Sequence, residues 1–346
     1  MEARPSASIV LLSPKNHVLL LHRVQTSSAF ASAYVFPGGN LSEFHDGIVP
    51  GPSDVKRHED SVAYRLGAIR ETFEESGILL ARKGGQDGEL LNLPSSERDD
   101  ARKAIYNNNI RFTEWLDSVG GVADIDNLLP FTRWITPQSQ PRRFSTPMYI
   151  YMLPLSTSDD PAISAAQSEA MVPTPDGGME ITAARFDHAS AWLEKQRKGE
   201  IILFPPQCFL LHILSQFLTG PSAVSLSPSE VVDHYRTQRE TVRSFLTTVP
   251  TTSEPRAARH STAQIPWADK VISPTTLGMR QRDRRVILGL DKPGTELKGT
   301  DRGGVWEHVV LVKFDKGVPK NVEVRLREEV LAEEREAERQ SWDAKL

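Results

Sequence analysis

Three glutamates that fall on one side of a single predicted helix constrain this chain more than any other feature. From Ser61 onward, apolar residues recur at three- and four-residue steps, which is the periodicity of an amphipathic helix, and Gly77 is a typical helix stop. Glu71, Glu74 and Glu75 occupy positions i, i+3 and i+4, so their side chains share one face. Like charges at this spacing destabilise a helix by about 0.2–0.5 kcal/mol per pair. An isolated pattern of this kind most often marks a solvated face, and the alternative is a site that holds a compensating cation.

The segments before this helix favour the cation site. Two short aliphatic runs, Ala7–Leu12 and Val18–His22, flank a Pro/Asn turn and predict a β-hairpin. A short strand then enters Phe36–Gly39, where two glycines allow the backbone to approach a metal or phosphate closely. Carboxylate oxygens on a rigid helix suit Mg²⁺ or Mn²⁺, and Arg70 can hold a neighbouring glutamate by ion pairing.

This arrangement resembles the Nudix box, G-x5-E-x7-R-E-U-x-E-E-x-G-U with U an aliphatic residue. The second half matches at Arg70, Glu71, Glu74, Glu75, Gly77 and Ile78, with Thr72 in the place of the aliphatic residue. The first half departs, because residues 40–69 stand where the consensus has only x5-E-x7. Loop-closure entropy grows slowly with length, so an insertion at about residues 40–60 is tolerated. It leaves the family's first glutamate unassigned between Glu43 and Asp46.

The resemblance implies an α+β fold, a Nudix α/β/α sandwich with a mixed sheet. It also implies an enzyme that hydrolyses a nucleoside diphosphate derivative, because a bound metal neutralises the diphosphate and activates a water for in-line attack. The catalytic residues implied are Arg70, Glu71, Glu74 and Glu75; the metal ligands implied are Glu71, Glu74, Glu75 and the carbonyl of Gly38 or Gly39. The general base stays open between one of these glutamates and Glu180, which precedes a predicted strand.

Further segments resemble the peroxisomal coenzyme A diphosphatase branch of the family. They are the long insertion within the box, Arg133–Pro137 followed by Pro141–Phe144, and Gly199–Gln207. The branch implies hydrolysis of coenzyme A or acyl-coenzyme A to adenosine 3′,5′-bisphosphate and (acyl-)phosphopantetheine. Specificity rests on this resemblance alone, because the extended coenzyme A signature of other such enzymes is not recognisable in Arg23–Tyr34.

Substrate contacts are predicted at three consecutive residues. Adjacent Arg142 and Arg143, flanked by Phe144, can bind the 3′-phosphate of coenzyme A and stack on adenine. The alternative is that they are surface arginines beside a strand. Other functions remain open: hydrolysis of NADH, nucleotide sugars or another nucleoside diphosphate derivative, or a Nudix-fold binding module without catalysis.

The length of 346 residues fits about two domains, or one domain with large insertions. We expect a Nudix domain over residues 1–220 and a C-terminal extension over 221–346, with a Thr/Ser/Pro-rich linker at about 246–264. The segment Glu323–Arg339 predicts a charged surface helix. The formal net charge of −4 argues against a nucleic acid polymer as partner, and no apolar run is long enough to span a membrane.

The cellular location is predicted from the two ends and the single cysteine. One residue, Cys208, cannot form an internal disulfide, which fits a reducing compartment. No signal peptide is expected at the amino terminus. The terminal Ala344-Lys345-Leu346 keeps the small–basic–Leu character of the Ser-Lys-Leu address. We therefore expect recognition by the peroxisomal import receptor and a peroxisomal location, with the cytoplasm as the alternative.

Overall fold

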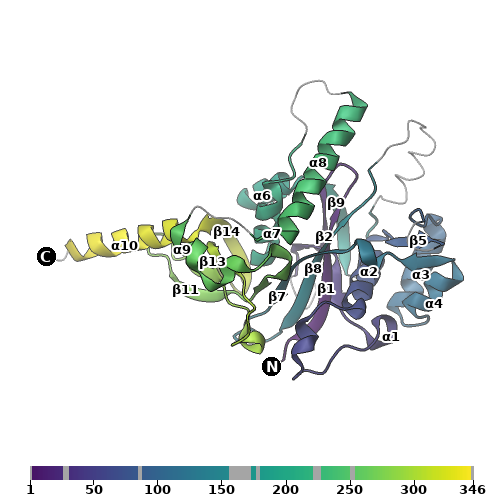
Figure 1. The fold of residues 1–346 in the computed structure, drawn as a ribbon, viewed down its shortest axis with the longest axis horizontal. Helices are drawn as coiled ribbons and strands as arrows, with labels where there is room; N and C mark the ends of the chain where they lie inside the picture. Colours follow the sequence, from purple (N-terminus) through teal and green to yellow (C-terminus); the bar gives the residue numbers. More distant parts are fainter. Residues whose placement is uncertain are drawn as a thin grey trace.

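An eight-stranded mixed sheet lies at the centre of the molecule (Figure 1). The computed structural model describes residues 2–25, 31–84, 88–155, 173–176, 180–220, 227–249 and 254–343. The strands of the sheet are β1 (Arg4–Leu12), β2 (Val18–Arg23), β3 (Tyr34–Val35), β4 (Gly38–Asn40), β7 (Leu129–Ile135), β8 (Phe144–Met152), β9 (Ile181–Asp187) and β10 (Val271–Ile272). Their order is β10-β7-β8-β1-β2-β3, with β4 also on β1 and β9 on β2. Strand β1 runs antiparallel to β2, as the predicted hairpin requires, and parallel to β8.

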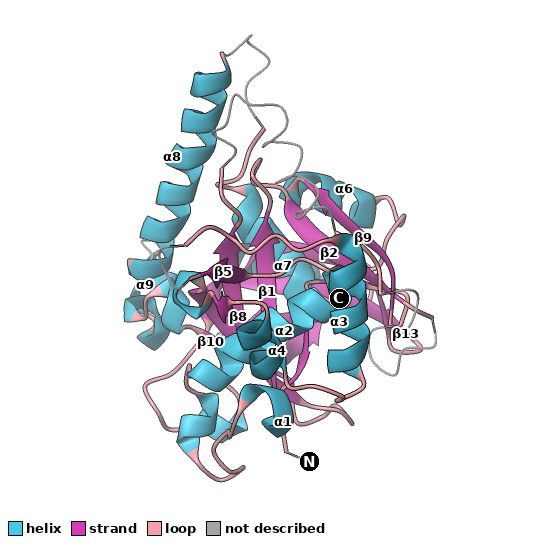
Figure 2. Ribbon diagram, turned by 90° about the vertical axis from the view of Figure 1, so that its right-hand side faces the viewer, coloured by secondary structure: helices cyan, strands magenta, loops and turns pink. Residues whose placement is uncertain are grey.

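Alternating side chains of the sheet feed two separate hydrophobic cores, one on each face. Ile9 and Leu11 of β1 face one core together with Phe73, whereas Val10 and Leu12 face the other. The first face is covered by α2 (Val62–Ser76), α3 (Ser95–Tyr106) and α4 (Phe112–Ser118), and the second by α6 (Ala189–Arg197), α7 (Pro205–Ser215) and α8 (Pro228–Thr247) (Figures 1 and 2). This layering confirms the predicted α+β class and the α/β/α sandwich.

The insertion within the box is folded onto the body of the protein. It contains the short helix α1 (Glu43–Asp46) and a 3₁₀ helix, Val55–His58. The Tyr64 hydroxyl donates to the Arg57 carbonyl at 2.5 Å, and His58 Nδ1 lies 2.9 Å from Ser145 Oγ on β8. A second small sheet joins β5 (Ala81–Lys83) to β6 (Gly121–Ala123) beside the 3₁₀ helix Ile125–Asn127.

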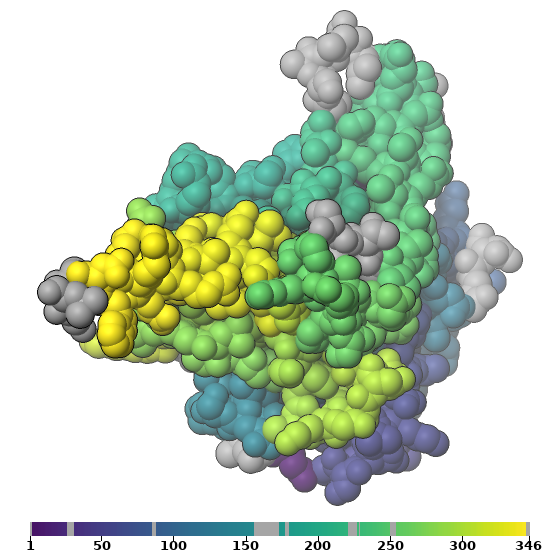
Figure 3. Space-filling view, turned by 60° about the vertical axis from the view of Figure 1, so that its left-hand side comes forward, coloured from purple at the N-terminus to yellow at the C-terminus, as the bar shows by residue number. Residues whose placement is uncertain are grey.

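The C-terminal region adds an antiparallel sheet that shares a core with the first. Its strands are β11 (Thr275–Met279), β12 (Val286–Leu290), β13 (Val305–Asp315) and β14 (Val318–Leu326), and α10 (Arg327–Asp343) follows them. Leu288 and Val310 of this sheet belong to the same hydrophobic cluster as Phe209 of α7. On the opposite face, Val309 clusters with Val330 of α10. Figure 3 shows the C-terminal part of the chain, in yellow, at the surface of the molecule.

Two predictions for the C-terminal region need correction. Where described, the expected linker at 246–264 holds the end of α8, α9 (Pro255–Arg259) and the 3₁₀ helix Ser261–Gln264, and Ala257 and Thr262 are buried. Its Pro and polar residues act as helix starts: the Glu254 side chain accepts from the backbone N–H of Ala257.

The predicted helix at Glu323–Arg339 instead begins at Arg327. The preceding residues belong to β14, where Val324 pairs with Val310 of β13. A 3₁₀ helix at Trp267–Asp269 and another at Thr295–Leu297 complete the region. Within the described ranges, no helix is both long enough and apolar enough to cross a bilayer.

Candidate active site

The carboxyl-terminal half of α2 carries the matched residues of the box. Gly77 ends the helix in the left-handed conformation, at φ 72°, and its N–H donates to the Phe73 carbonyl. Thr72, which replaces the aliphatic residue of the consensus, is fully buried, and its hydroxyl donates to the Ala68 carbonyl at 2.8 Å. A local hydrogen bond thus satisfies the polar atom that the substitution introduces.

Arg70 joins three carboxylates of α1 and α2 into one buried group, and Glu75 lies on the same helix. Its Nε and Nη2 atoms donate to the two oxygens of Asp46 at 2.9 and 2.8 Å. Its Nη1 atom lies 2.8 Å from Glu74 and 2.9 Å from Glu71. Burial disfavours the guanidinium charge, but Glu71 and Asp46 outweigh that effect and raise the pKa of Arg70. We call Asp46, Glu71, Glu74 and Glu75 the carboxylate cluster.

The two positions proposed for the family's first glutamate have different surroundings. Asp46 is buried at the end of α1 and accepts from Arg70, whereas Glu43 is exposed. Asp46 also accepts from the backbone N–H of Ser42 at 2.8 Å, so its carboxylate joins the start of the short helix to Arg70 of α2. The folded insertion therefore brings Asp46, and not Glu43, to the carboxylate cluster.

The glycine turn packs directly against the glutamates. The N–H of Gly38 donates to Glu75 Oε2 at 2.8 Å. The Glu71 carboxylate lies so close to Gly39 that any side chain at this position would overlap it. The turn thus approaches two of the three glutamates closely, and its predicted approach to a metal or phosphate stays a prediction.

Burial makes the negative charge of these glutamates costly. Burial, opposed by Arg70, raises the pKa of Glu71 to about 7. Burial also raises the pKa of Glu74, and burial together with the charge of Glu71 raises that of Glu75 well above its usual range. Each glutamate would gain from a cation nearby, because a positive charge favours the ionised carboxylate.

The donor chemistry of the cluster fits a hard divalent cation. Glutamate oxygens and a backbone carbonyl are the ligands that Mg²⁺ and Mn²⁺ prefer. As the side chains stand, no three or more His, Cys, Asp or Glu residues of the described ranges are arranged to hold a metal ion. Glu74 is turned to Arg70 and Glu75 to Gly38, so both would have to turn to bind one. Metal binding by Glu71, Glu74, Glu75 and Gly39 stays a prediction.

Glu180 lies at the edge of this cluster. Arg23, at the end of β2, pairs with Glu180 at 2.8 Å and with Glu75 at 3.5 Å. The Asp176 carboxylate accepts from the backbone N–H groups of Glu180 and Ile181, which fixes the start of β9. The structure thus brings the candidate base outside the box close to the box itself. Sequence analysis did not single out Arg23, because a cation at the end of a strand is a common surface feature.

The three predicted substrate contacts are placed differently from one another. Arg143 is buried, pairs with Glu296 at 2.6 Å and donates to the Thr136 carbonyl at 2.9 Å. Arg143 is thus paired inside the fold, and its predicted contact with a substrate phosphate would have to compete with Glu296. Arg142 is exposed and Phe144 is half-buried at the start of β8. Substrate contact by these two residues stays a prediction.

Two arginines that sequence analysis missed support α2 from α3. The guanidinium of Arg102 donates to the Glu74 carbonyl from Nε and Nη2, at 3.0 and 2.8 Å. It also donates to the Thr174 carbonyl at 3.2 Å, and Arg98 donates to the Gly77 carbonyl at 3.3 Å. These bonds satisfy carbonyls at the end of α2 that a helix leaves without partners. In the sequence, the four-residue spacing of Arg98 and Arg102 was the signal that both side chains share one face of α3.

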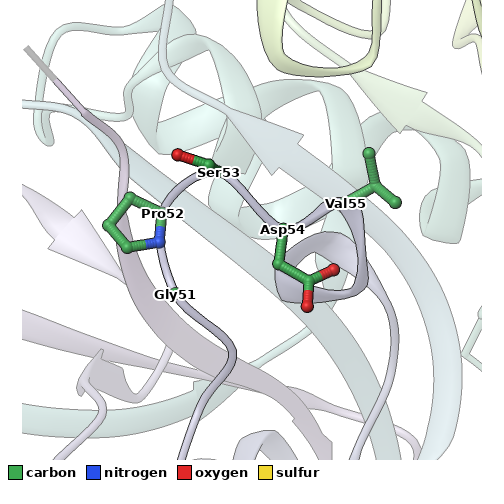
Figure 4. A pocket seen from close by; sticks show the side chains of 5 residues that line it. All are labelled: Gly51, Pro52, Ser53, Asp54 and Val55. Atoms are coloured by element: carbon green, nitrogen blue, oxygen red, sulfur yellow. The ribbon is translucent and has the colours of Figure 1, made fainter.

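A shallow depression in the insertion is separate from the carboxylate cluster. Its lining is the single segment Gly51–Val55, and no member of the cluster contributes to it. Figure 4 shows the Asp54 side chain beside its own backbone. Asp54 Oδ1 accepts from the Lys56 N–H at 2.9 Å, which caps the 3₁₀ helix that follows. The depression therefore reflects local turn structure.

Comparison with known proteins supports the resemblance read from the box. Residues 52–214 match the family model described as NUDT19 Nudix domain. The chain is 29% identical over 214 residues to nudix hydrolase 7 of Caenorhabditis elegans, which covers 62% of this chain and 61% of that protein. It is 28% identical over 256 residues to the acyl-coenzyme A diphosphatase NUDT19 of Gallus gallus, covering 60% and 63% respectively. The chain thus spans less than two thirds of the length of these relatives.

Among solved structures, a NUDIX hydrolase from Alicyclobacillus acidocaldarius is similar with a TM-score of 0.47 and 23% identity. The similarity covers 61% of this chain and 90% of that chain. An Ap4A hydrolase from C. elegans is similar with a TM-score of 0.28 and 15% identity, covering 62% and 97%.

Proposed function

We propose that this chain, which carries a Nudix domain resembling the coenzyme A diphosphatase branch, hydrolyses the diphosphate bond of coenzyme A or an acyl-coenzyme A. The products would be adenosine 3′,5′-bisphosphate and (acyl-)phosphopantetheine. The observation that carries the proposal is the carboxylate cluster itself. Three glutamates of one helix lie together: Arg70 joins Glu71 and Glu74, and the Gly-Gly turn packs on Glu71 and Glu75. The name of the NUDT19 relative from Gallus gallus, an acyl-coenzyme A diphosphatase, supports the substrate.

The residues of the site would divide the work as follows. Glu71, Glu74 and Glu75, with the Gly39 carbonyl, would hold Mg²⁺ or Mn²⁺. A divalent cation bound there neutralises diphosphate oxygens and makes a water more acidic for attack on phosphorus. Arg70 and Asp46 keep Glu71 and Glu74 in place through their ion pairs. A carboxylate accepts the proton of the attacking water, either one of these glutamates or Glu180 beside Arg23.

The proposal is tested by incubating the purified full chain with coenzyme A, NADH or ADP-ribose in the presence of Mg²⁺ or Mn²⁺. Mass spectrometry identifies the products. We expect adenosine 3′,5′-bisphosphate from coenzyme A, and no product when EDTA replaces the metal. Cleavage of NADH without cleavage of coenzyme A would falsify the substrate and favour the alternative of another nucleoside diphosphate derivative.

A Nudix-fold binding module without catalysis is the alternative from another class. Such a module has no need of three aligned buried glutamates, whose charges raise one another's pKa and oppose folding. Keeping all three together with Arg70 therefore favours the enzyme. Absence of any product from all three substrates would favour the module.

We also propose a peroxisomal location, through recognition of Ala344-Lys345-Leu346 by the import receptor. These three residues lie outside the described ones and follow directly on α10. A fluorescent protein fused to the amino terminus of the chain should give punctate fluorescence that becomes diffuse when the three residues are deleted. Diffuse fluorescence of both fusions would point to the cytoplasm.

A further inference from the structure

One stripe of α3 runs alongside the end of α2 that carries the glutamates. Arg98, Arg102 and Tyr106 are spaced by four residues, so they follow one another along one side of α3. Arg98 contacts the Gly77 carbonyl and Arg102 contacts the Glu74 carbonyl. One turn toward the carboxyl end of α3 therefore corresponds to about one turn toward the amino end of α2. Tyr106, the next residue of the stripe, is therefore directed along α2 toward the turn before Glu74.

The electrostatic surroundings of Tyr106 agree with this register. Its partial burial raises its pKa, and the charges of Glu180, Asp176, Glu74 and Glu71 raise it further. These carboxylates belong to the end of α2 and to the segment before β9, so Tyr106 shares the electrostatic surroundings of the candidate site. The hydroxyl stays protonated at neutral pH.

The Tyr106 ring is open to solvent at the edge of the candidate site. Its exposed fraction is 42%, which is high for a large aromatic side chain. Within the described ranges, no residue forms a hydrogen bond with its hydroxyl. Among the described residues, no hydrogen bond or ring stacking therefore accounts for this side chain, although Ile105 beside it is fully buried.

The proposed substrate needs such a group. The carboxylate cluster can act on the diphosphate through a metal, but its negative charge offers nothing to a neutral nucleobase. An aromatic ring binds a nucleobase by stacking, which does not depend on charge. Arg143, which was expected beside an adenine site, is instead held by Glu296.

We propose that Tyr106 is a substrate-positioning residue whose exposed ring stacks on the nucleobase while the carboxylate cluster acts on the diphosphate. This role rests on the proposed function, because it presumes a nucleoside diphosphate derivative in the site. It assigns recognition of the base to a helix that Arg98 and Arg102 fix to α2. The distance between base and reacting phosphorus would then be set by the packing of these two helices.

The test compares Tyr106→Leu, which removes the ring, with Tyr106→Phe, which keeps it. Phe314→Leu is the matched control, because Phe314 is a similarly exposed aromatic residue on β13 of the second sheet. Calorimetric titration in Mg²⁺ measures binding of ADP and, separately, of inorganic pyrophosphate, and steady-state kinetics give KM and kcat for coenzyme A. Thermal unfolding verifies that each variant is folded.

We expect Tyr106→Leu to weaken ADP binding and raise KM by about five- to 150-fold, the range measured for one stacked base. Pyrophosphate binding should stay within about threefold of the unaltered protein, and kcat should change less than KM because stacking acts equally on bound substrate and transition state. Tyr106→Phe and Phe314→Leu should behave as the unaltered protein.

Three results would overturn the inference: equal weakening of ADP and pyrophosphate, no change in either, or a loss in Tyr106→Phe as large as in Tyr106→Leu. The proposed function fails separately. A chain that binds ADP through Tyr106 but cleaves no coenzyme A would retain this inference and lose the proposed reaction.

Discussion

In the carboxylate cluster, the negative charges that the proposed function needs are the ones whose burial opposes folding. Arg70 contacts Asp46, Glu71 and Glu74 at once, yet the pKa of Glu71 remains raised, to about 7. One buried guanidinium therefore does not fully offset the negative charge packed around it. The remaining charge is available to a bound cation.

The first residue-scale prediction concerns Glu74. Replacing it by Gln keeps its volume and removes one charge from the proposed metal site. We expect Glu74→Gln to lower kcat for coenzyme A at least about 100-fold, comparable to losing a principal electrostatic stabiliser. Steady-state assays at saturating Mg²⁺ measure this. Glu97→Gln, at an exposed position of α3, is the control. Near-normal turnover of Glu74→Gln would refute its role.

The second residue-scale prediction concerns pH and His58. Burial, aided by the charge of Arg133, lowers the pKa of His58 to about 4 from its ordinary value of 6.5. Between about pH 6.5 and 4, His58 is therefore protonated in the unfolded chain and neutral in the folded chain. The contribution of neutral His58 to stability is complete above this window and is lost as the pH falls through it.

Urea unfolding at pH 7.5 and at pH 5 measures this effect. The free energy of unfolding should fall between the two pH values, and it should fall less in His58→Gln, which cannot take up the proton. Equal declines in the two proteins would show that His58 does not contribute. Ser145, whose hydroxyl lies 2.9 Å from His58 and accepts from Arg133, is left unchanged in both proteins.

Among the secondary-structure elements, α8 shows how a segment without a recognised role supports the sheet. Arg239 is buried and donates to the Ser13 carbonyl at 2.9 Å, to Asn16 Oδ1 at 2.7 Å and to the Leu153 carbonyl at 2.7 Å. Burial lowers its pKa to about 10, so it remains charged at neutral pH. One side chain thus joins α8 to the turn of the first hairpin and to the end of β8.

We expect Arg239→Met to lower the free energy of unfolding by about 2 kcal/mol or more, because it leaves buried carbonyls without a donor. Urea unfolding at pH 7.5 measures the change. Arg236→Met is the control, since Arg236 is exposed on the same helix and, among the described residues, pairs with nearby Asp233 alone. A loss in the control as large as in Arg239→Met would mean that general effects on α8, and not the buried bonds, are responsible.

Element prediction succeeded where periodicity was strong and failed where other signals had to be read. The hairpin and α2 followed from their apolar spacing, and both are present. Helix α8 was missed, although Ser227 and Glu230 form a capping box that the sequence displays as S-x-x-E. Strand β14 was taken for the start of a helix because its charged residues suit both structures, and only its pairing with β13 distinguishes them.

For the molecule as a whole, the family resemblance supplied the layers of the sandwich but not the contacts between distant segments. The glycines were expected to approach a metal or phosphate, and the structure places them against Glu71 and Glu75. The ion pair of Arg143 with Glu296 was not, because the two lie far apart in sequence. Long-range pairs of this kind leave no local pattern for a single sequence to reveal.

The hydrophobic core shared by α7 and the second sheet determines whether the two parts of the chain can fold separately. Apolar residues from beyond position 220, among them Val242, Trp267 and Ile272, fill the same core as Trp134 and Phe209. Ending the chain after residue 220 would expose that apolar surface to water, so the part that matches the family model depends on the rest for its core. A calorimeter should therefore record the melting of both parts as one peak.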